Sequence, residues 1–148
     1  MSSPSQGPHQ EQPLLEAGTA LDAAQAALVL VHGRGASARS ILGMGREVQQ
    51  EGLGLLAPQA ADSEWYPESF LAPIPANEPG RKSGLQAIER AITRALDAGI
   101  PQERIVLAGF SQGACLVSEY VATRPDRYGG LAALSGGLLG ETVDPADY

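Results

Sequence analysis

The chain has 148 residues, enough for one domain with a buried core, and a formal net charge of −7. Ten basic residues against 17 acidic ones leave no basic stripe to neutralise phosphates, so the composition argues against a nucleic-acid-binding protein. One cysteine and two histidines far apart in the sequence give neither a disulfide framework nor the ligand pattern of a metal site, and no cofactor is indicated.

The N-terminal residues 1–13 are polar and rich in proline. They contain no apolar stretch of the kind that a signal peptide or a membrane span requires. We therefore expect a disordered lead-in over residues 1–13, with His9 in solvent, followed over residues 14–148 by the N-terminal part of a single domain. This composition predicts a cytoplasmic protein without a transmembrane segment.

Strands and helices are predicted to alternate after this lead-in. The apolar runs that predict strands are Ala26–Val31, Leu53–Ala57, Ile105–Ala108 and Gly130–Leu134. Helices are predicted from Ser37 or Ser40 to about Gln50, from Ser83 to about Gly99, and from Gln112 to about Thr123. The first is expected to bury Ile41, Leu42 and Val48, and the second to open with a capping box at Ser83. Continuous apolar strands that alternate with helices are typical of an α/β fold with a parallel sheet.

The segment between the second strand and the second helix, residues 58–80, holds five prolines and shows no periodicity. It is predicted to be a long irregular loop, and loops of this length usually carry function. Trp65 and Tyr66 are neighbours in this loop. Aromatic residues in such a position either line a binding pocket or pin the loop to the core, and the sequence leaves both interpretations open.

The most informative segment is the one in which a buried strand leads into a helix through Gly109-Phe-Ser-Gln-Gly113. This is the G-x-S-x-G pattern of a nucleophile elbow. Gly109 and Gly113 have no Cβ, so the chain can make a strained turn that lifts the Ser111 hydroxyl away from the sheet. The pattern predicts that Ser111 attacks a carbonyl carbon.

An oxyanion hole is predicted next to this serine. In folds with such an elbow, one donor is the backbone N–H of the residue after the nucleophile, here Gln112, and the other comes from the loop after an earlier strand. That loop begins at His32 and Gly33, and we expect the Arg34 N–H to be the second donor. Glycine at position 33 lets the main chain approach a substrate closely.

These motifs occur in an order that resembles a known family. They are His32–Ser37, Ala57–Gln59, Trp65–Pro67, Asn77–Pro79, Gly109–Ala114 and Leu134–Gly136. Over roughly Ala26 to Tyr148 the chain resembles the phospholipase/carboxylesterase family of α/β-hydrolases, which includes acyl-protein thioesterase-like enzymes. The resemblance implies a Ser-Asp-His triad without a metal, and hydrolysis of short or medium acyl esters.

The resemblance places the triad acid and base on loops after later strands, and no histidine follows Ser111 in the sequence. We therefore expect an α/β-hydrolase sheet, mostly parallel and flanked by helices, that lacks the C-terminal strands and leaves Gly130–Leu134 at or near an open edge. His32 lies on the wrong side of Ser111 for a base in this fold, so it is expected to support the oxyanion loop. Cys115 is expected to be a small buried hydrophobe, and Glu78 either orients a group in the cleft or caps a helix.

The sequence thus predicts a serine hydrolase of carboxylic esters that acts through an acyl-serine intermediate on a small-molecule acyl ester or lysophospholipid. Trp65 and Tyr66 are the candidate substrate-binding residues. The alternative is a hydrolase-fold fragment without turnover, or an interaction module. Gly33–Ala38 also matches the G-x-G-x-x-A dinucleotide fingerprint, but Pro58 and Gln59 stand where a nucleotide site needs an acidic residue.

Overall fold

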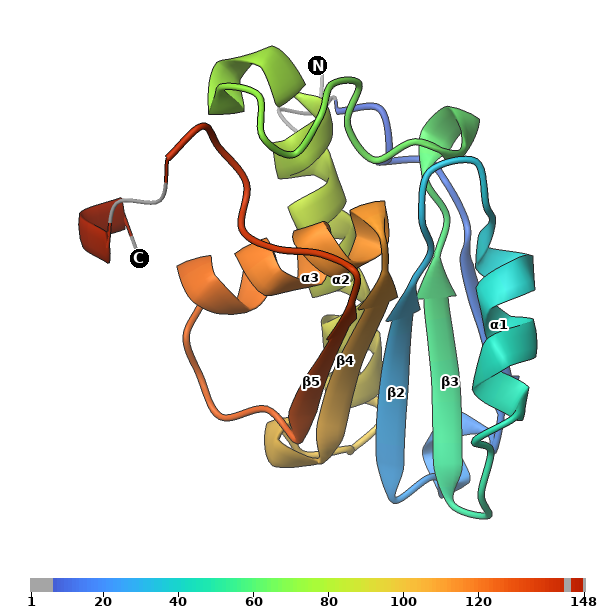
Figure 1. Ribbon diagram of the computed structural model, residues 1–148. Coiled ribbons are helices and arrows are strands. Elements are labelled where there is room, and N and C mark those ends of the chain that lie inside the picture. Colours follow the sequence, from blue (N-terminus) through green and yellow to red (C-terminus); the bar gives the residue numbers. More distant parts are fainter. Residues whose placement is uncertain (1–6, 143–144, 148) are drawn as a thin grey trace, which may run out of the picture.

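The computed structural model describes residues 7–142 and 145–147, and it has an α/β fold in which helices flank one five-stranded sheet (Figure 1). The strands are β1 (Leu14–Gly18), β2 (Ala26–Val31), β3 (Leu53–Pro58), β4 (Ile105–Phe110) and β5 (Gly130–Leu134). The α-helices are α1 (Ala38–Arg46), α2 (Gly80–Asp97) and α3 (Gln112–Thr123). The predicted fold class is confirmed, and all four predicted strands are present.

The sheet has the strand order β1-β3-β2-β4-β5. Every neighbouring pair is parallel except β1 and β3. β1 was not predicted, because its five residues form a half-buried edge without clean alternation. β5 lies at the opposite edge, as expected. Since parallel strands point the same way, the loops that follow β2, β3, β4 and β5 gather at one end of the sheet.

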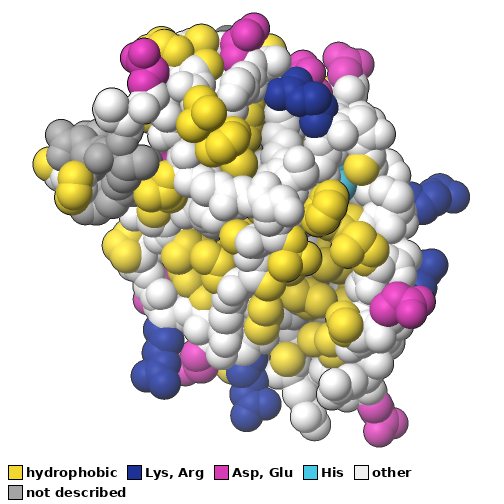
Figure 2. Space-filling model, in the orientation of Figure 1, with side chains coloured by type: hydrophobic (Ala, Val, Ile, Leu, Met, Phe, Trp, Pro, Cys, Tyr) yellow, Lys and Arg dark blue, Asp and Glu magenta, His cyan; other side chains and the backbone are white. Residues whose placement is uncertain are grey.

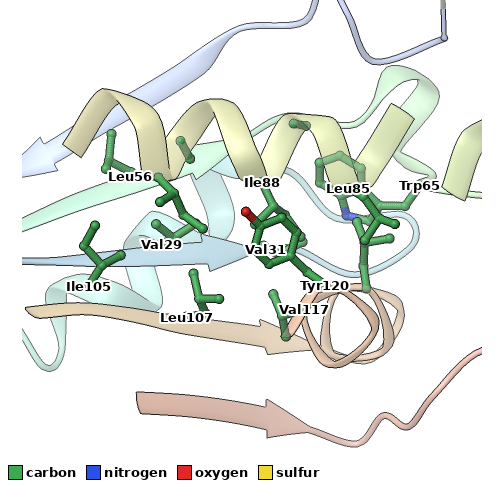
Figure 3. Close-up of a cluster of buried hydrophobic side chains, with 14 of the residues drawn as sticks. Val29, Val31, Leu56, Trp65, Leu85, Ile88, Ile105, Leu107, Val117 and Tyr120 are labelled. Atoms are coloured by element: carbon green, nitrogen blue, oxygen red, sulfur yellow. The ribbon is translucent and has the colours of Figure 1, made fainter. Parts of the chain in front are cut away.

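The two faces of the sheet carry separate hydrophobic cores. α2 and α3 pack on one face, and α1 packs on the other (Figure 1). Side chains alternate along β2, so that Val29 and Val31 join the larger core while Leu30 joins the smaller core under α1. Figure 3 shows the larger core, where Ile88 of α2 and Val117 of α3 meet the sheet.

The first predicted helix is shorter than expected. Its N-terminus is capped by Ser37, whose Oγ accepts the Ser40 N–H at 3.1 Å, and the helix ends at Arg46. Val48 therefore lies beyond the last turn and is 57% exposed, so its predicted burial is wrong. Ile41 and Leu42 are buried as predicted.

The second predicted helix begins earlier than expected. It starts at Gly80, so Ser83 lies inside the helix and not at its cap. The Ser83 Oγ instead accepts the backbone N–H of His9 at 2.9 Å. This bond belongs to a chain segment, residues 7–13, that packs against α2 rather than extending into solvent. Residues 1–6 of the expected lead-in lie outside the described residues.

The prediction that His9 is a solvated tail residue is wrong, because its side chain is only 1% exposed. The polar composition of residues 1–13 favoured a solvent-exposed His9. A neutral imidazole can nevertheless be buried when both of its nitrogens have hydrogen-bond partners. The His9 ring meets this condition. Nε2 lies 2.8 Å from the Trp65 carbonyl, and Nδ1 lies 3.0 Å from the Ala61 nitrogen.

Candidate active site

Ser111 stands at the junction between β4 and α3 in a backbone conformation that few residues adopt. Its φ is 56° and its ψ is −116°, and the residue is exposed at the end of the sheet. Such a left-handed conformation is strained for a residue with a side chain and persists where neighbouring groups hold it. Here the Ser111 N–H donates to the Leu134 carbonyl at 2.8 Å, and the Ser111 carbonyl accepts the Cys115 N–H at 3.1 Å.

Glycines surround this turn because there is no room for a Cβ. A Cβ on Gly113 would lie 2.0 Å from the Val31 carbonyl oxygen, and one on Gly109 would lie 2.4 Å from the Gly113 oxygen. On Gly33 it would lie 3.3 Å from the Ser111 Cβ. The close approach of β2, β4 and α3 therefore depends on these three residues.

The loop between β2 and α1 reaches the same place from the neighbouring strand. The Arg34 guanidinium forms an ion pair with Glu64 and donates to the Pro67 carbonyl at 3.2 Å and the Glu68 carbonyl at 3.0 Å. The Gly35 N–H donates to the Ser63 carbonyl at 2.8 Å. These bonds fix the loop against residues 63–68.

Two residues that line the cavity at Ser111 have a free backbone amide. Arg34 and Gln112 line the same cavity as the serine. Within the part of the chain that the structure describes, neither of their N–H groups has an acceptor. The first N–H groups of a helix have no partner inside the helix, which explains the amide at Gln112. Free backbone N–H groups are the donors from which oxyanion sites are built.

The side chain of Gln112 has a second role, which sequence reasoning missed. Its Oε1 accepts the Trp65 N–H at 2.7 Å, and its Nε2 donates to the Tyr66 carbonyl at 2.8 Å. The side chain is buried, and both its amide oxygen and its amide nitrogen have hydrogen-bond partners, as buried polar groups generally do. No spacing rule in the sequence predicts this pairing, because the partners lie far away in a loop without periodicity.

The cavity over Ser111 has a volume of about 270 Å³ and is lined by Arg34, Tyr66, Ser69, Phe70, Ser111, Gln112, Cys115 and Ser135. Tyr66 is thus brought to the serine, and burial raises the pKa of its phenol, with the Cys115 thiol beside it adding to the rise. Cys115 is buried, as expected. Ser69 and Ser135 also line the wall, and the sequence did not reveal their approach to the site.

Trp65 lies apart from this cavity, in the core. It is fully buried and its indole Nε1 donates to the His32 carbonyl at 2.8 Å. Of the two interpretations that the sequence leaves open, this geometry favours the pinning of the loop to the core for Trp65, whereas Tyr66 lines the cavity. Figure 3 shows the Trp65 indole among the buried side chains beside Leu85.

His32 supports the loop with both ring nitrogens. The Ala60 N–H donates to its Nε2 at 3.0 Å, so the proton of the neutral ring lies on Nδ1, which donates to the Gly33 carbonyl at 2.8 Å. Burial lowers the pKa of His32, although the hydrogen bond to Gly33 opposes this effect. A ring with no free lone pair cannot take the proton of Ser111. The chain's other histidine, His9, is held in the same way.

Glu78 acts at the start of α2. Its Oε1 accepts the Lys82 N–H at 3.0 Å, which is a helix cap, and its other oxygen lies 3.3 Å from the Arg81 Nε. Within residues 7–142 and 145–147, no three His, Cys, Asp or Glu side chains form a group that could hold a metal ion. Over the same residues, no helix has the length and apolar character needed to span a membrane.

Comparison with known proteins identifies the family. The sequence matches the phospholipase/carboxylesterase family over residues 16–143. The chain belongs to this family. It is 39% identical over 84 residues to acyl-protein thioesterase 1 of Saccharomyces cerevisiae, in a match that covers 56% of this chain and 35% of the yeast protein. It is 47% identical over 57 residues to acyl-protein thioesterase 1 of Kluyveromyces lactis, which covers 38% of this chain and 25% of that protein.

The fold agrees with a solved member of the phospholipase/carboxylesterase family. The structure of a phospholipase/carboxylesterase from Dyadobacter fermentans superimposes with a TM-score of 0.89 at 36% sequence identity, covering 93% of this chain and 66% of that one. The chain therefore spans about a third of the yeast relative's length and about two thirds of the bacterial protein's. The resemblance carried by the motifs is confirmed at the level of family and fold.

Proposed function

We propose that the chain carries the nucleophile and the oxyanion site of a serine hydrolase that cleaves carboxylic esters through an acyl-serine intermediate. The observation that carries this proposal is the exposed Ser111 with a φ of 56°, at the wall of a cavity that Arg34 and Gln112 also line. Membership of the phospholipase/carboxylesterase family supports the same reaction class.

In the proposed mechanism the Ser111 Oγ attacks the acyl carbon and gives its proton to a base. The carbonyl oxygen becomes negative, and the Arg34 and Gln112 N–H groups donate to it. The bond to the alcohol then breaks and the alcohol leaves with the proton, so that the acyl group stays on Ser111. Water adds to this ester in the same way, releases the carboxylic acid and restores the serine.

The substrate proposed is an acyl ester or lysophospholipid, with its acyl group against Tyr66 and Phe70 in the cavity. The names of the yeast relatives, acyl-protein thioesterase 1, extend the proposal to thioesters. An ester and a thioester need the same nucleophile and the same oxyanion donors, and they differ only in the leaving group.

The second candidate function is an interaction module of the same fold without turnover. One observation favours it: His9 and His32 are the only histidines of the sequence, and each uses both ring nitrogens in hydrogen bonds. The proton of Ser111 must therefore go to another base. Imidazole added to the solution can take this role, which makes the two candidates distinguishable.

The test measures hydrolysis of p-nitrophenyl acetate by the chain at increasing imidazole concentration near pH 7. We expect a rate that rises linearly with imidazole, above the rate of the Ser111→Ala variant, which accounts for hydrolysis by imidazole alone. An intact oxyanion hole contributes about 10² to 10³ in rate per donor, so the difference should be measurable without a triad.

A fluorophosphonate probe identifies the reactive group in the same samples. Mass spectrometry should place the adduct on Ser111, and Ser135→Ala, which removes another hydroxyl of the same cavity, should leave the adduct unchanged. An adduct on Ser135 or Cys115 would overturn the assignment of the nucleophile. Equal rates for the wild-type chain and Ser111→Ala at all imidazole concentrations would favour the interaction module.

A further inference from the structure

The segment formed by residues 7–13 contacts the long loop after β3 through the His9 side chain. The His9 ring packs edge-on against the Trp65 indole, with 4.9 Å between ring centroids and 63° between ring planes. Its Nδ1 is 3.0 Å from the Ala61 nitrogen and its Nε2 is 2.8 Å from the Trp65 carbonyl oxygen. Both partners belong to the long loop that follows β3, so His9 joins the N-terminal segment to this loop.

The protonation state of His9 follows from these partners. A backbone N–H can only donate, so the Ala61 N–H donates to Nδ1, and the ring proton lies on Nε2 and is donated to the Trp65 carbonyl. Burial lowers the pKa of His9, and Arg90 beside it adds to this effect, although the hydrogen bond to Trp65 opposes it. The ring is therefore neutral and has one fixed tautomer.

Trp65 in turn contacts the oxyanion loop, which begins at His32 and Gly33. Its indole Nε1 donates to the His32 carbonyl at 2.8 Å, and the His32 ring lies against the indole with centroids 5.1 Å apart. His32 is followed directly by Gly33 and then by Arg34, which lines the cavity. Two bonds, one at the Trp65 carbonyl and one at its indole, thus connect His9 to the oxyanion loop.

A different set of bonds docks the N-terminal segment on α2. The Arg90 guanidinium donates to the His9 carbonyl at 3.0 Å and to the Gln10 Oε1 at 2.8 Å, and the Gln10 amide donates to Gln86. None of these bonds uses the His9 ring. Docking of the segment and contact with Trp65 are therefore separable by mutation.

We propose that His9 is a positioning residue of the candidate site: its neutral ring holds the Trp65 main chain, and through the Trp65 indole it fixes the His32 carbonyl and the Arg34 amide that follows. The N-terminal segment then forms part of the oxyanion structure although it does not reach the cavity. The catalytic consequence rests on the proposed function, whereas the structural coupling does not.

The experiment measures hydrogen exchange by nuclear magnetic resonance in the full chain. Trp65 is the only tryptophan, so its indole N–H gives a single resonance that reports the bond to His32. His9→Asn offers an acceptor near Ala61 but is too short to donate to the Trp65 carbonyl. His9→Gln reaches that carbonyl with an amide donor. Gln10→Ala is the matched control, since it removes docking bonds and leaves the His9 ring in place.

We expect His9→Asn to speed the exchange of the Trp65 indole N–H and of the Gly35 N–H by roughly tenfold, the effect of one lost hydrogen bond in a buried site. The amides of β4 should keep their wild-type rates. His9→Gln should restore slow exchange, and Gln10→Ala should not change it at these two positions. Faster exchange throughout β4 and α3, or no change in His9→Asn, would overturn the proposal.

Hydrolysis with added imidazole gives the catalytic readout. Because an oxyanion donor acts in the transition state, His9→Asn should lower kcat with little change in KM, and His9→Gln should recover it. A wild-type chain without hydrolysis that depends on Ser111 would overturn the proposed function and leave the exchange rates to decide the positioning role. An unchanged kcat in a His9→Asn variant whose loop exchanges faster would overturn the catalytic consequence of the coupling.

Discussion

The two faces of the sheet differ in how completely helices cover them. On one face, α2 and α3 cover β2, β3 and β4, and the larger core between them includes Trp65 and Cys115. On the other face, α1 packs on β1, β2 and β3 and leaves β4 and β5 open. Phe110 is 46% and Leu134 is 49% exposed there, and Figure 2 shows hydrophobic side chains over this part of the sheet.

The covered face holds the side chains that support the loops around Ser111. Trp65 and Gln112, which hold the loops around Ser111, are buried on the side of α2 and α3. The edge strand β5, which α3 contacts on the covered face, adds the Leu134 carbonyl that accepts the Ser111 N–H. Substitutions on the covered face should therefore disturb both stability and site, whereas side chains on the open face should govern contacts with other molecules.

The largest effect on stability is expected from Gly113→Ala in α3, and Gly43→Ala in α1 is the comparison on the other face. In Gly113→Ala the new Cβ meets the Val31 carbonyl oxygen at 2.0 Å, whereas Gly43 in α1 has nothing within 4 Å of an added Cβ. We expect Gly113→Ala to lose more than about 4 kcal/mol of stability. Gly43→Ala should gain about 0.5 to 1 kcal/mol, because alanine favours the helix.

Urea unfolding followed by circular dichroism measures both changes. A Gly113→Ala variant as stable as the wild-type chain would show that α3 can move away from β2, and the covered face would then be less rigid than its packing indicates.

A smaller effect is expected from pH, because two histidines are buried near Trp65. Burial lowers the pKa of His9 and His32 in the folded chain, so between those values and about 6.5 the unfolded chain binds more protons. Stability should therefore fall as the pH drops below 6.5, by at most about 1.4 kcal/mol per pH unit for each histidine. Urea unfolding followed by Trp65 fluorescence at pH 8 and pH 5.5 tests this.

His9→Gln is the control for the pH dependence, because it keeps a donor for the Trp65 carbonyl and removes one titrating ring. It should reduce the difference in unfolding free energy between the two pH values by up to half. A wild-type chain that is equally stable at both values would contradict the burial of neutral histidines.

The smallest effect on stability is expected at the open face. Leu134→Lys places a charge on the exposed edge strand, where it should change the unfolding free energy by no more than about 0.5 kcal/mol. It should also reduce self-association, since charged side chains protect sheet edges from pairing. Light scattering at increasing protein concentration measures this change.

Leu96→Lys is the matched control, because Leu96 is an exposed leucine of α2. The same change of charge there should leave self-association as it is. Equal reductions in both variants would assign the effect to net charge and not to the open face.

The sequence predicted the strands well where their burial is continuous. The strand predicted over Ala26–Val31 has both of its observed bounds. A run of six apolar residues between a polar turn and His32 is typical of a buried strand. The start of α2 was predicted wrongly. Ser83 fits a capping box locally, but in the structure its buried Oγ accepts the backbone N–H of His9. Local propensity cannot reveal a partner that lies so far away in the sequence.

The candidate site likewise contains residues that motifs predicted and residues whose positions no motif predicted. Ser111, Gln112 and Arg34 were predicted from motifs with short spacings, and the structure places all three at one cavity, while their roles stay predictions. The different positions of Trp65 and Tyr66 could not be predicted. They depend on the side-chain amide of Gln112 and on the His32 carbonyl, which meet these two residues only after the sheet has formed.

The hydrogen bond from the Ser111 N–H to the Leu134 carbonyl has a consequence for biosynthesis. The acceptor comes later in the chain than Ser111, so a nascent polypeptide can form the turn at Ser111 with this support only after Leu134 has left the ribosome. Until then the amide of Ser111 lacks this acceptor, and nothing from β5 holds its left-handed backbone. A growing chain thus lacks this support for the Ser111 backbone until β5 has been made.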